Sequence, residues 1–211
     1  NSPWGRGRPG WHIECSAMAK TYLGEVFDIH AGGLDLIFPH HENEIAQSCC
    51  AHGTNHMAKY WLHNGFVTMN NEKMSKSLGN VISVAEAMAK YRPEVLRAAL
   101  LSAHYRAPLD LSESNMQDAH NGLDRLYRAA GESLPSHEAV DQIFMKSLCD
   151  DLNTPAAIAR LHELARKANK GNQAAATALK SSAHVIGLLR HTADDWAKGG
   201  IVVSGGEGTQ L

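Results

Sequence analysis

The sequence predicts an α/β domain followed by an all-α helical bundle. An apolar run at residues 26–30 ends at a pair of glycines, and residues 60–67 return to strand character after a helical stretch that begins at Pro39. Strand, helix and strand in this order are typical of a parallel βαβ unit. Between residues 108 and 192, apolar residues recur at helical spacing instead, which predicts an antiparallel bundle.

The individual elements have local signals. Ser83 and Glu86 form a capping box at the start of a helix, and Asn153-Thr154-Pro155 caps another. The helical faces that we expect to be buried consist of Met116, Leu123, Leu126, Tyr127 and Ala130, then Ile158, Leu161, Leu164 and Ala168, with a third helix at about 174–190. We therefore predict domains at 1–107 and 108–198, followed by a Gly-rich linker or frayed end at 199–211.

Composition restricts the function classes. The 211 residues have a formal net charge of −2, without the overall basic excess of many nucleic-acid-binding domains, although a local basic face remains open. We find no apolar run of about 18 residues and no signal-peptide pattern, so we expect a cytoplasmic protein without a membrane partner. Only Cys49 and Cys50 of the four cysteines are close in sequence, which argues against a disulfide framework.

A metal site is suggested by three residues. His40 and Glu44 are four apart and would share one face of a helix, which allows both to hold one ion. This spacing is also common for pairs of solvent-exposed side chains on one helix. Cys15 follows a Gly-rich turn and could complete a thiol, imidazole and carboxylate set suited to zinc, although a free cysteine is more often a small buried hydrophobe.

A second motif is the run Lys73-Met74-Ser75-Lys76-Ser77-Leu78-Gly79-Asn80, which lies between a predicted strand and a capped helix. Two lysines and two hydroxyls on a short loop can surround a polyphosphate and stabilise charge that develops on it. A generic lysine-rich loop is the alternative. The predicted loop lies at residues 73–77.

The motifs together resemble a known family. Residues 73–77 match the second signature of class I aminoacyl-tRNA synthetases letter for letter, and residues 7–18, 27–30, 33–44 and 104–106 closely resemble cysteinyl-tRNA synthetases. The resemblance runs from residue 1 to about residue 195. It implies the C-terminal half of a class I catalytic domain, Rossmann-like with a parallel sheet, plus a helix bundle.

The resemblance also implies roles for individual residues. Cys15, His40 and Glu44 match zinc ligands, and Trp11 matches the wall of the amino-acid pocket. Binding of ATP, with magnesium, is implied for Gly33, Asp35 and Lys76, with Lys73 supporting Lys76 in catalysis. From its position at the end of a predicted strand beside the glycines, we also expect His30 to contact the substrate or the adenosine of ATP. The implied activity is ATP-dependent attachment of cysteine to tRNA(Cys) through cysteinyl-adenylate, by a protein that we expect to be a monomer.

Two family features are absent from the sequence. The first signature, His-x-Gly-His, does not occur, and neither does the upstream cysteine that would be a fourth zinc ligand. We therefore interpret the chain as a fragment, and we expect it to be inactive by itself.

Two other functions stay open. One is a mycothiol-type cysteine ligase, which also makes cysteinyl-adenylate, although Glu44 argues against it. The other is a non-catalytic zinc-binding or RNA-binding module descended from a synthetase, although the intact 73–77 motif argues against that. Several basic residues could face tRNA phosphates or simply form solvated helix faces, namely Lys20, Arg97, Arg106, Arg125 and Arg128.

Overall fold

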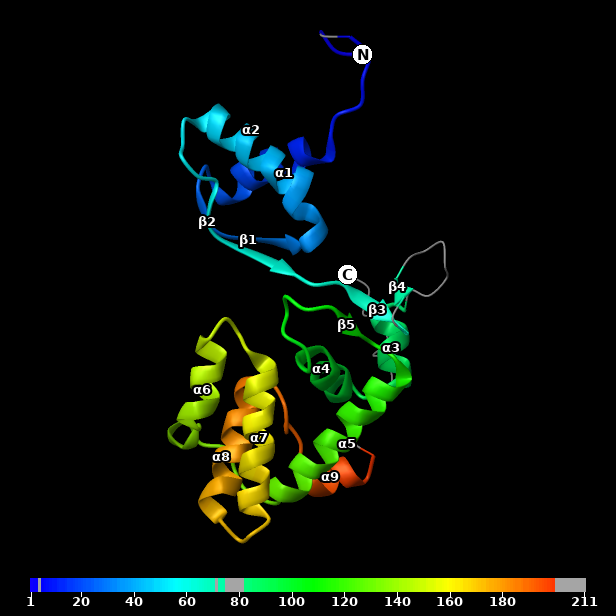
Figure 1. The fold of residues 1–211 in the computed structure, drawn as a ribbon, viewed down its shortest axis with the longest axis vertical. Coiled ribbons are helices and arrows are strands. Elements are labelled where there is room, and N and C mark those ends of the chain that lie inside the picture. Colours follow the sequence, from blue (N-terminus) through cyan, green and yellow to red (C-terminus); the bar gives the residue numbers. More distant parts are fainter. Residues whose placement is uncertain (4, 71, 75–81, 200–211) are drawn as a thin grey trace, which may run out of the picture. The chain divides into compact units, whose positions relative to one another are not determined.

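The computed structural model describes residues 1–3, 5–70, 72–74 and 82–199 (Figure 1). Contacts divide the chain into two compact units, residues 1–66 and residues 67–211. Within the described residues, no helix has the length and apolar character that crossing a membrane requires.

The first unit contains a parallel pair of strands and two helices. Its elements are α1 (Trp11–Leu23), β1 (Phe27–Gly33), α2 (Glu42–His52) and β2 (Ala58–Asn64). The register of β1 and β2 runs from Phe27 opposite Ala58 to Gly33 opposite Asn64, so the predicted βαβ unit is confirmed. Phe27, Met57 and Ala58 form its small buried cluster, with Ala19 and Trp61 packed against it.

The segment before α2 differs from the prediction. The sequence suggested a helix from Pro39, but regular α-helix begins at Glu42, after a 3-10 turn at Leu34–Leu36 and a wider turn at Ile37–His41. Phe38 is extended, with φ −135° and ψ 132°. A residue before proline is disfavoured in the helical region by contact with the proline ring, which explains the interruption.

Helix α1 had no clear sequence signal. Its apolar residues do not form one stripe, and Trp11, Ile13, Met18 and Leu23 are exposed. Gly10 and Gly24 are the capping residues that flank the helix, and the Gly24 backbone N–H donates to the carbonyl of Lys20.

The second unit combines a small sheet with helices. Its elements are β3 (Val67–Met69), β4 (Glu72–Lys73), α3 (Val84–Lys90), α4 (Pro93–Leu101), β5 (Leu109–Asp110), α5 (Glu113–Ala130), α6 (Gln142–Cys149), α7 (Thr154–Ala168), α8 (Gln173–Val185) and α9 (Ala193–Ala197). Strand β3 lies between β4, which is antiparallel to it, and β5, which is parallel. Helix α7 packs on α5, α6 and α8 (Figure 1).

The helix caps and buried faces of the second unit agree with the sequence. Ser83 and Glu86 make the predicted capping box, and the side chain of Asn153 accepts a hydrogen bond from the Ala156 N–H at 3.1 Å. The expected apolar residues of α5 are all buried, whereas on α7 Leu161 and Leu164 are buried and Ile158 and Ala168 are half-buried.

The boundary between the contact units precedes the predicted domain boundary at residue 107. Val95 of α4 belongs to the same buried cluster as Leu123 and Leu161, so α4 packs with the bundle helices. The division into domains at 1–107 and 108–198 stays a prediction, and the linker predicted at 199–211 lies, beyond Gly199, outside the described residues.

Candidate metal and substrate site

The first component of the site is the start of α1. Trp11 and Cys15 are four residues apart on this helix, so their side chains lie on the same face, one turn from each other. The Trp11 ring packs against the His40 imidazole, with 4.3 Å between ring centroids. Trp11 remains 59% exposed, which leaves much of the indole available to a ligand.

The second component is the junction between the turn at Ile37–His41 and α2. His40 is the fourth residue of the turn, and Glu44 lies in the first turn of α2, where a carboxylate also interacts favourably with the helix dipole. The His40 Nε2 atom lies 2.5 Å from Glu44 Oε1. The predicted spacing of four residues therefore brings both side chains together.

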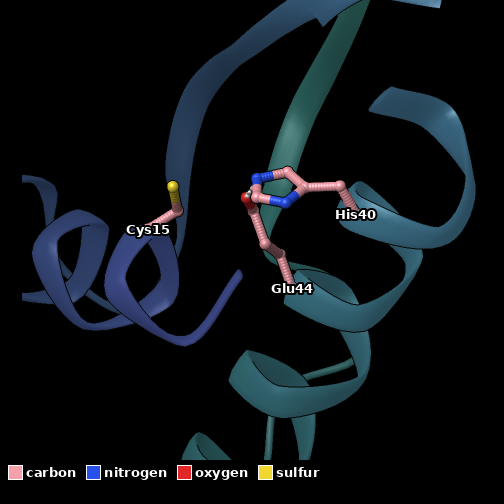
Figure 2. Close-up of side chains that lie close together, drawn as sticks. All are labelled: Cys15, His40 and Glu44. Atoms are coloured by element: carbon pink, nitrogen blue, oxygen red, sulfur yellow. Dashed lines mark ion pairs between the residues drawn. The ribbon is translucent and has the colours of Figure 1, made fainter. Parts of the chain in front are cut away.

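These two components converge. Figure 2 shows the Cys15 thiol on α1 beside the imidazole of His40 and the carboxylate of Glu44. One ligand atom from each residue lies within 4.8 Å of the other two. The chain thus brings together a soft sulfur, an imidazole nitrogen and a carboxylate oxygen, the donor types that zinc prefers.

The Glu44 carboxylate gives an independent test of whether a cation fits. Glu44 is only 1% exposed, and neither of its oxygens receives a hydrogen bond of acceptable geometry from the described residues. His30 Nε2 and His40 Nε2 are close, at 2.9 and 2.5 Å, but they are poorly directed as donors. A buried carboxylate needs a compensating charge, so a bound cation fits this site.

The electrostatics of Cys15 agree with this conclusion. Burial raises the pKa of the Cys15 thiol above its ordinary value, and the negative charge of Glu44 raises it further. The neighbouring Trp11 side chain acts in the opposite direction. Metal coordination deprotonates a thiol, and the ion would also offset the repulsion between thiolate and carboxylate.

An aromatic and imidazole cluster lies on the β-strand side of the site. His41 Nδ1 lies 2.8 Å from His63 Nε2, and the His41 ring packs against His30 and Trp61. Burial, together with the neighbouring histidines, lowers the pKa of His41 to about 4. His41 is therefore neutral at physiological pH and can both donate and accept a hydrogen bond.

Gly32 permits the close packing of this cluster. A Cβ atom at this position would lie 2.8 Å from Cε1 of the His41 ring and 3.0 Å from its Nε2. Because β1 carries His30 two residues earlier, Gly32 lets α2 approach the strand while His30 reaches Glu44. The glycine that the sequence places at the end of β1 thus has a steric role in the site.

The remaining predicted site residues lie near this cluster or outside the residues that the structure describes. Gly33 ends β1, and Asp35 lies exposed in the following turn, so both are at the carboxyl end of a parallel strand, where ligands of α/β folds bind. His30 contacts Glu44, which places it with the metal set. The backbone of Lys73 forms part of β4, whereas Lys76 lies outside the described residues.

Sequence reasoning assigned no role to His41, Trp61 or His63. His41 stands next to His40, and Trp61 and His63 alternate along β2, so that both project from one face of the strand. That alternation of aromatic residues on a strand was the available signal. The second group of possible ligands, His30, His41 and Glu44, shares its carboxylate with the first.

Comparison with known families agrees with this fold. A family model described as "tRNA synthetases class I (C) catalytic domain" matches residues 1–121, more than half of the chain, and one described as "DALR domain" matches residues 143–190. The chain belongs to the class I tRNA synthetase family, with a catalytic domain of the C type followed by a DALR helical domain.

The chain is also similar to curated proteins over most of its own length. A protein named "Cysteine--tRNA ligase" from Afipia carboxidovorans is 53% identical over 196 residues, covering 93% of this chain and 42% of the relative. One of the same name from Rhodospirillum centenum is 54% identical over 205 residues, covering 94% of this chain and 45% of the relative. The chain therefore spans less than half the length of these relatives.

Solved structures support the fold. A putative arginyl-tRNA synthetase from Campylobacter jejuni has a TM-score of 0.56 at 14% identity, covering 86% of this chain and 51% of that chain. A LeuRS in ternary complex with tRNA and LeuAMS, from Agrobacterium radiobacter K84, has a TM-score of 0.52 at 21% identity, covering 76% and 24%. At these identities the likeness shows the fold alone.

Proposed function

We propose that this chain forms part of an enzyme that joins cysteine to tRNA(Cys) in two steps. Cysteine and ATP first give cysteinyl-adenylate and pyrophosphate, and the cysteinyl group then passes to the terminal ribose hydroxyl of the tRNA with release of AMP. The observation that carries the proposal is the convergence of Cys15, His40 and Glu44 on one point. Curated relatives that are named for this ligation and are 53% and 54% identical to the chain support it.

Selection of the substrate rests on the side chains around this point. Cys15, His40 and Glu44 would hold a zinc ion, which prefers a thiolate sulfur to the hydroxyl oxygen of serine. Trp11 packs on His40 and offers its exposed face as a wall for the amino acid. A site that depends on contact with sulfur can reject serine without a separate editing step.

Activation requires groups that hold ATP. Gly33 and Asp35 lie at the carboxyl end of β1, where the nucleoside would bind, and His30 lies in the middle of the same strand. Lys73 and Lys76 belong to the phosphate loop that the sequence predicts. The cysteine carboxylate attacks the α-phosphorus in line, and pyrophosphate leaves. A lysine beside the phosphates stabilises the charge that moves onto them in this step.

Cysteine-dependent exchange between ATP and pyrophosphate tests the proposal, using protein from the longest reading frame that contains this sequence. We expect exchange with cysteine and none above background with serine. Cys15→Ser should abolish the exchange, whereas Cys50→Ser, a change of the same kind at an exposed thiol on α2, should preserve it. Equal exchange with both amino acids would contradict the proposal.

A further inference from the structure

The second unit contains a charged cluster that the proposed chemistry does not use. Asp151, in the turn between α6 and α7, accepts hydrogen bonds from the Tyr105 hydroxyl at 2.7 Å and from Arg106, through Nε at 2.6 Å and Nη2 at 3.2 Å. His104 Nε2 lies 3.9 Å from the same carboxylate. We call these four residues the Asp151 clasp. Arg106, one of the basic residues that the sequence left open, is therefore paired within its own unit.

The clasp joins two parts of the chain that belong to different family matches. Its hydrogen-bond donors fall within residues 1–121, which match the catalytic-domain model, and its acceptor falls within residues 143–190, which match the DALR model. A second contact runs beside it, because Thr154 Oγ1 donates to the Ala103 carbonyl at 3.3 Å. The start of α7 and the turn before it thus hold the segment 103–106 at two points.

The backbone at the acceptor has a conformation that residues other than glycine usually avoid. Asp151 and Leu152 both have positive φ, 52° and 55°. In this left-handed region the Cβ atom comes too close to the following carbonyl oxygen, so two such residues in a row are unfavourable. The Leu152 N–H donates to the Leu148 carbonyl at 3.1 Å, which closes the turn. This is the conformation in which the Asp151 carboxylate meets Arg106.

A gain in stability does not account for the clasp. The side chains of Arg106 and Asp151 are 51% and 49% exposed, and exposed ion pairs contribute little to the free energy of unfolding because water screens them. Hydrogen bonds from Arg106 and Tyr105 lower the pKa of Asp151 to about 2, so the carboxylate is charged at physiological pH. An unfavourable backbone conformation that is kept for a weak surface pair is typical of a functional segment.

The segment that the clasp holds leads directly into β5, which begins three residues after Arg106. Strand β5 pairs with β3 in parallel, with Thr68 opposite Asp110. The Thr68 hydroxyl donates to the Asp110 carboxylate at 2.9 Å, and the Leu111 N–H donates to the Thr68 carbonyl at 2.9 Å. Strand β5 is therefore restrained by the clasp before it and by β3 beside it.

Strand β3 connects this restraint to β4. Thr68 is opposite Asp110 on one side and opposite Lys73 on the other. Lys73 is the first residue of the predicted phosphate loop, so only β5 and β3 separate its backbone from the clasp. A loop that stabilises charge on reacting phosphates must be placed accurately, because a displacement of about 1 Å can cost about a hundredfold in rate.

We propose that Asp151 is a positioning residue for cysteine activation. Through Tyr105 and Arg106 it fixes the approach to β5, and through β5 and β3 it fixes the backbone of Lys73, where the phosphate loop begins. This inference rests on the proposed function, because adenylate formation is the step that the loop serves. Asp151 itself touches no reactant. Its effect is on the rate at which bound cysteine and ATP react, and not on the affinity for cysteine.

The test measures adenylate formation by rapid quench at saturating cysteine and ATP, in protein from the longest reading frame that contains this sequence. Asp151→Asn should slow this step by at least about tenfold, with the cysteine affinity and thermal unfolding of the parent. Asparagine tolerates the left-handed region and keeps one oxygen acceptor, so the turn should be retained. Asp194→Asn removes an exposed ion pair with Lys198 on α9, and this matched control should keep the parent rate.

A double-mutant cycle tests whether Asp151 acts through Arg106. Arg106→Gln should slow adenylate formation by a similar factor, and its combination with Asp151→Asn should slow it no further, because both substitutions remove the same contact. A parent rate in either single variant, effects that multiply in the double variant, or an equal loss in Asp194→Asn would overturn the proposal. If Asp151→Asn unfolds at a lower temperature, Tyr105→Phe decides: slower adenylate formation supports the proposal, and the parent rate overturns it.

Amide hydrogen exchange measures the restraint without any reaction. In the 211-residue chain, Asp151→Asn should speed exchange of the amides in β3 and β5 and of the Leu111 N–H, whereas Asp194→Asn should not. Unchanged exchange in Asp151→Asn would also overturn the proposal.

These measurements separate this inference from the proposed function. Failure of the unsubstituted enzyme to form adenylate contradicts only the proposed function, and amide exchange then still tests the clasp. An enzyme that forms adenylate at the parent rate in every clasp variant contradicts only this inference.

Discussion

Glu44 Oε2 of α2 lies 2.9 Å from His30 Nε2 of β1, while its other oxygen faces His40. The carboxylate is thus enclosed between a strand and its own helix, close to the thiol of Cys15. A buried charge with imidazoles on two sides and a thiol on a third is costly without a cation.

Zinc affinity should depend on Cys15 and Glu44. We expect Cys15→Ser and Glu44→Gln each to weaken zinc binding by at least about tenfold, since one replaces a soft ligand and the other removes the compensating charge. Competition with a chromophoric chelator measures the affinity in the 211-residue chain. Cys50→Ser is the matched control, and a similar loss in that variant would contradict the assigned ligand set.

Gly32→Ala should destabilise the first unit. The added Cβ would meet the His41 ring at 2.8 Å, where β1 and α2 are tightly packed. Overpacking of this kind costs roughly 1–3 kcal/mol of unfolding free energy. Gly122→Ala is the control, because its Cβ would meet nothing within 4 Å and α5 should gain about 1 kcal/mol from alanine. Denaturant unfolding of both variants checks the contrast.

Arg160→Lys should destabilise the helical bundle. Arg160 binds Asp141 through two hydrogen bonds, from Nε at 3.0 Å and from Nη2 at 2.8 Å, with both side chains largely buried. Lysine cannot reproduce this paired geometry, so we expect a loss of about 1–3 kcal/mol in unfolding free energy. Arg190→Lys, at an exposed position, should change it little, and equal effects would contradict this assignment.

The same pair predicts an acid dependence. Arg160, together with the Phe144 N–H, holds the pKa of Asp141 below its ordinary value in the folded state. The ion pair therefore stabilises the folded state fully above the unfolded-state pKa of Asp141, about 3.9. This stabilisation is lost as pH falls through the folded-state pKa of Asp141. The difference in unfolding free energy between Arg160→Lys and the parent should shrink below about pH 4, as unfolding measured from pH 7 downwards would show.

Lys76→Ala should slow cysteine activation in protein from the longest reading frame. Loss of one charge that stabilises the reacting phosphates costs about 3 kcal/mol, roughly a hundredfold in rate, while cysteine affinity changes little. Rapid-quench measurement of adenylate formation tests this, with Lys146→Ala as the control. An unchanged rate would remove Lys76 from the mechanism. We expect the 211-residue chain by itself to show no exchange.

Sequence patterns correctly predicted the structural elements that depend only on residues close together in the chain. The capping box at Ser83 and the apolar face of α5 follow from spacing along one helix, and the structure confirms both. Helix α1 was missed because its apolar residues do not form one stripe. The start of α2 was misplaced because an extended residue precedes Pro39.

The candidate site shows the same division between what local sequence determines and what tertiary packing decides. Sequence by itself identified Cys15, His40 and Glu44 as candidate ligands, because their chemistry and the spacing of the last two are properties of the chain. Only the tertiary structure decided that His30 and His41 lie beside the carboxylate with Trp61 packed against both rings, since strand pairing and the approach of α2 over Gly32 bring them together. Likewise, Arg106 and Asp151 are far apart in the chain, and only the packing of the second unit makes them an ion pair.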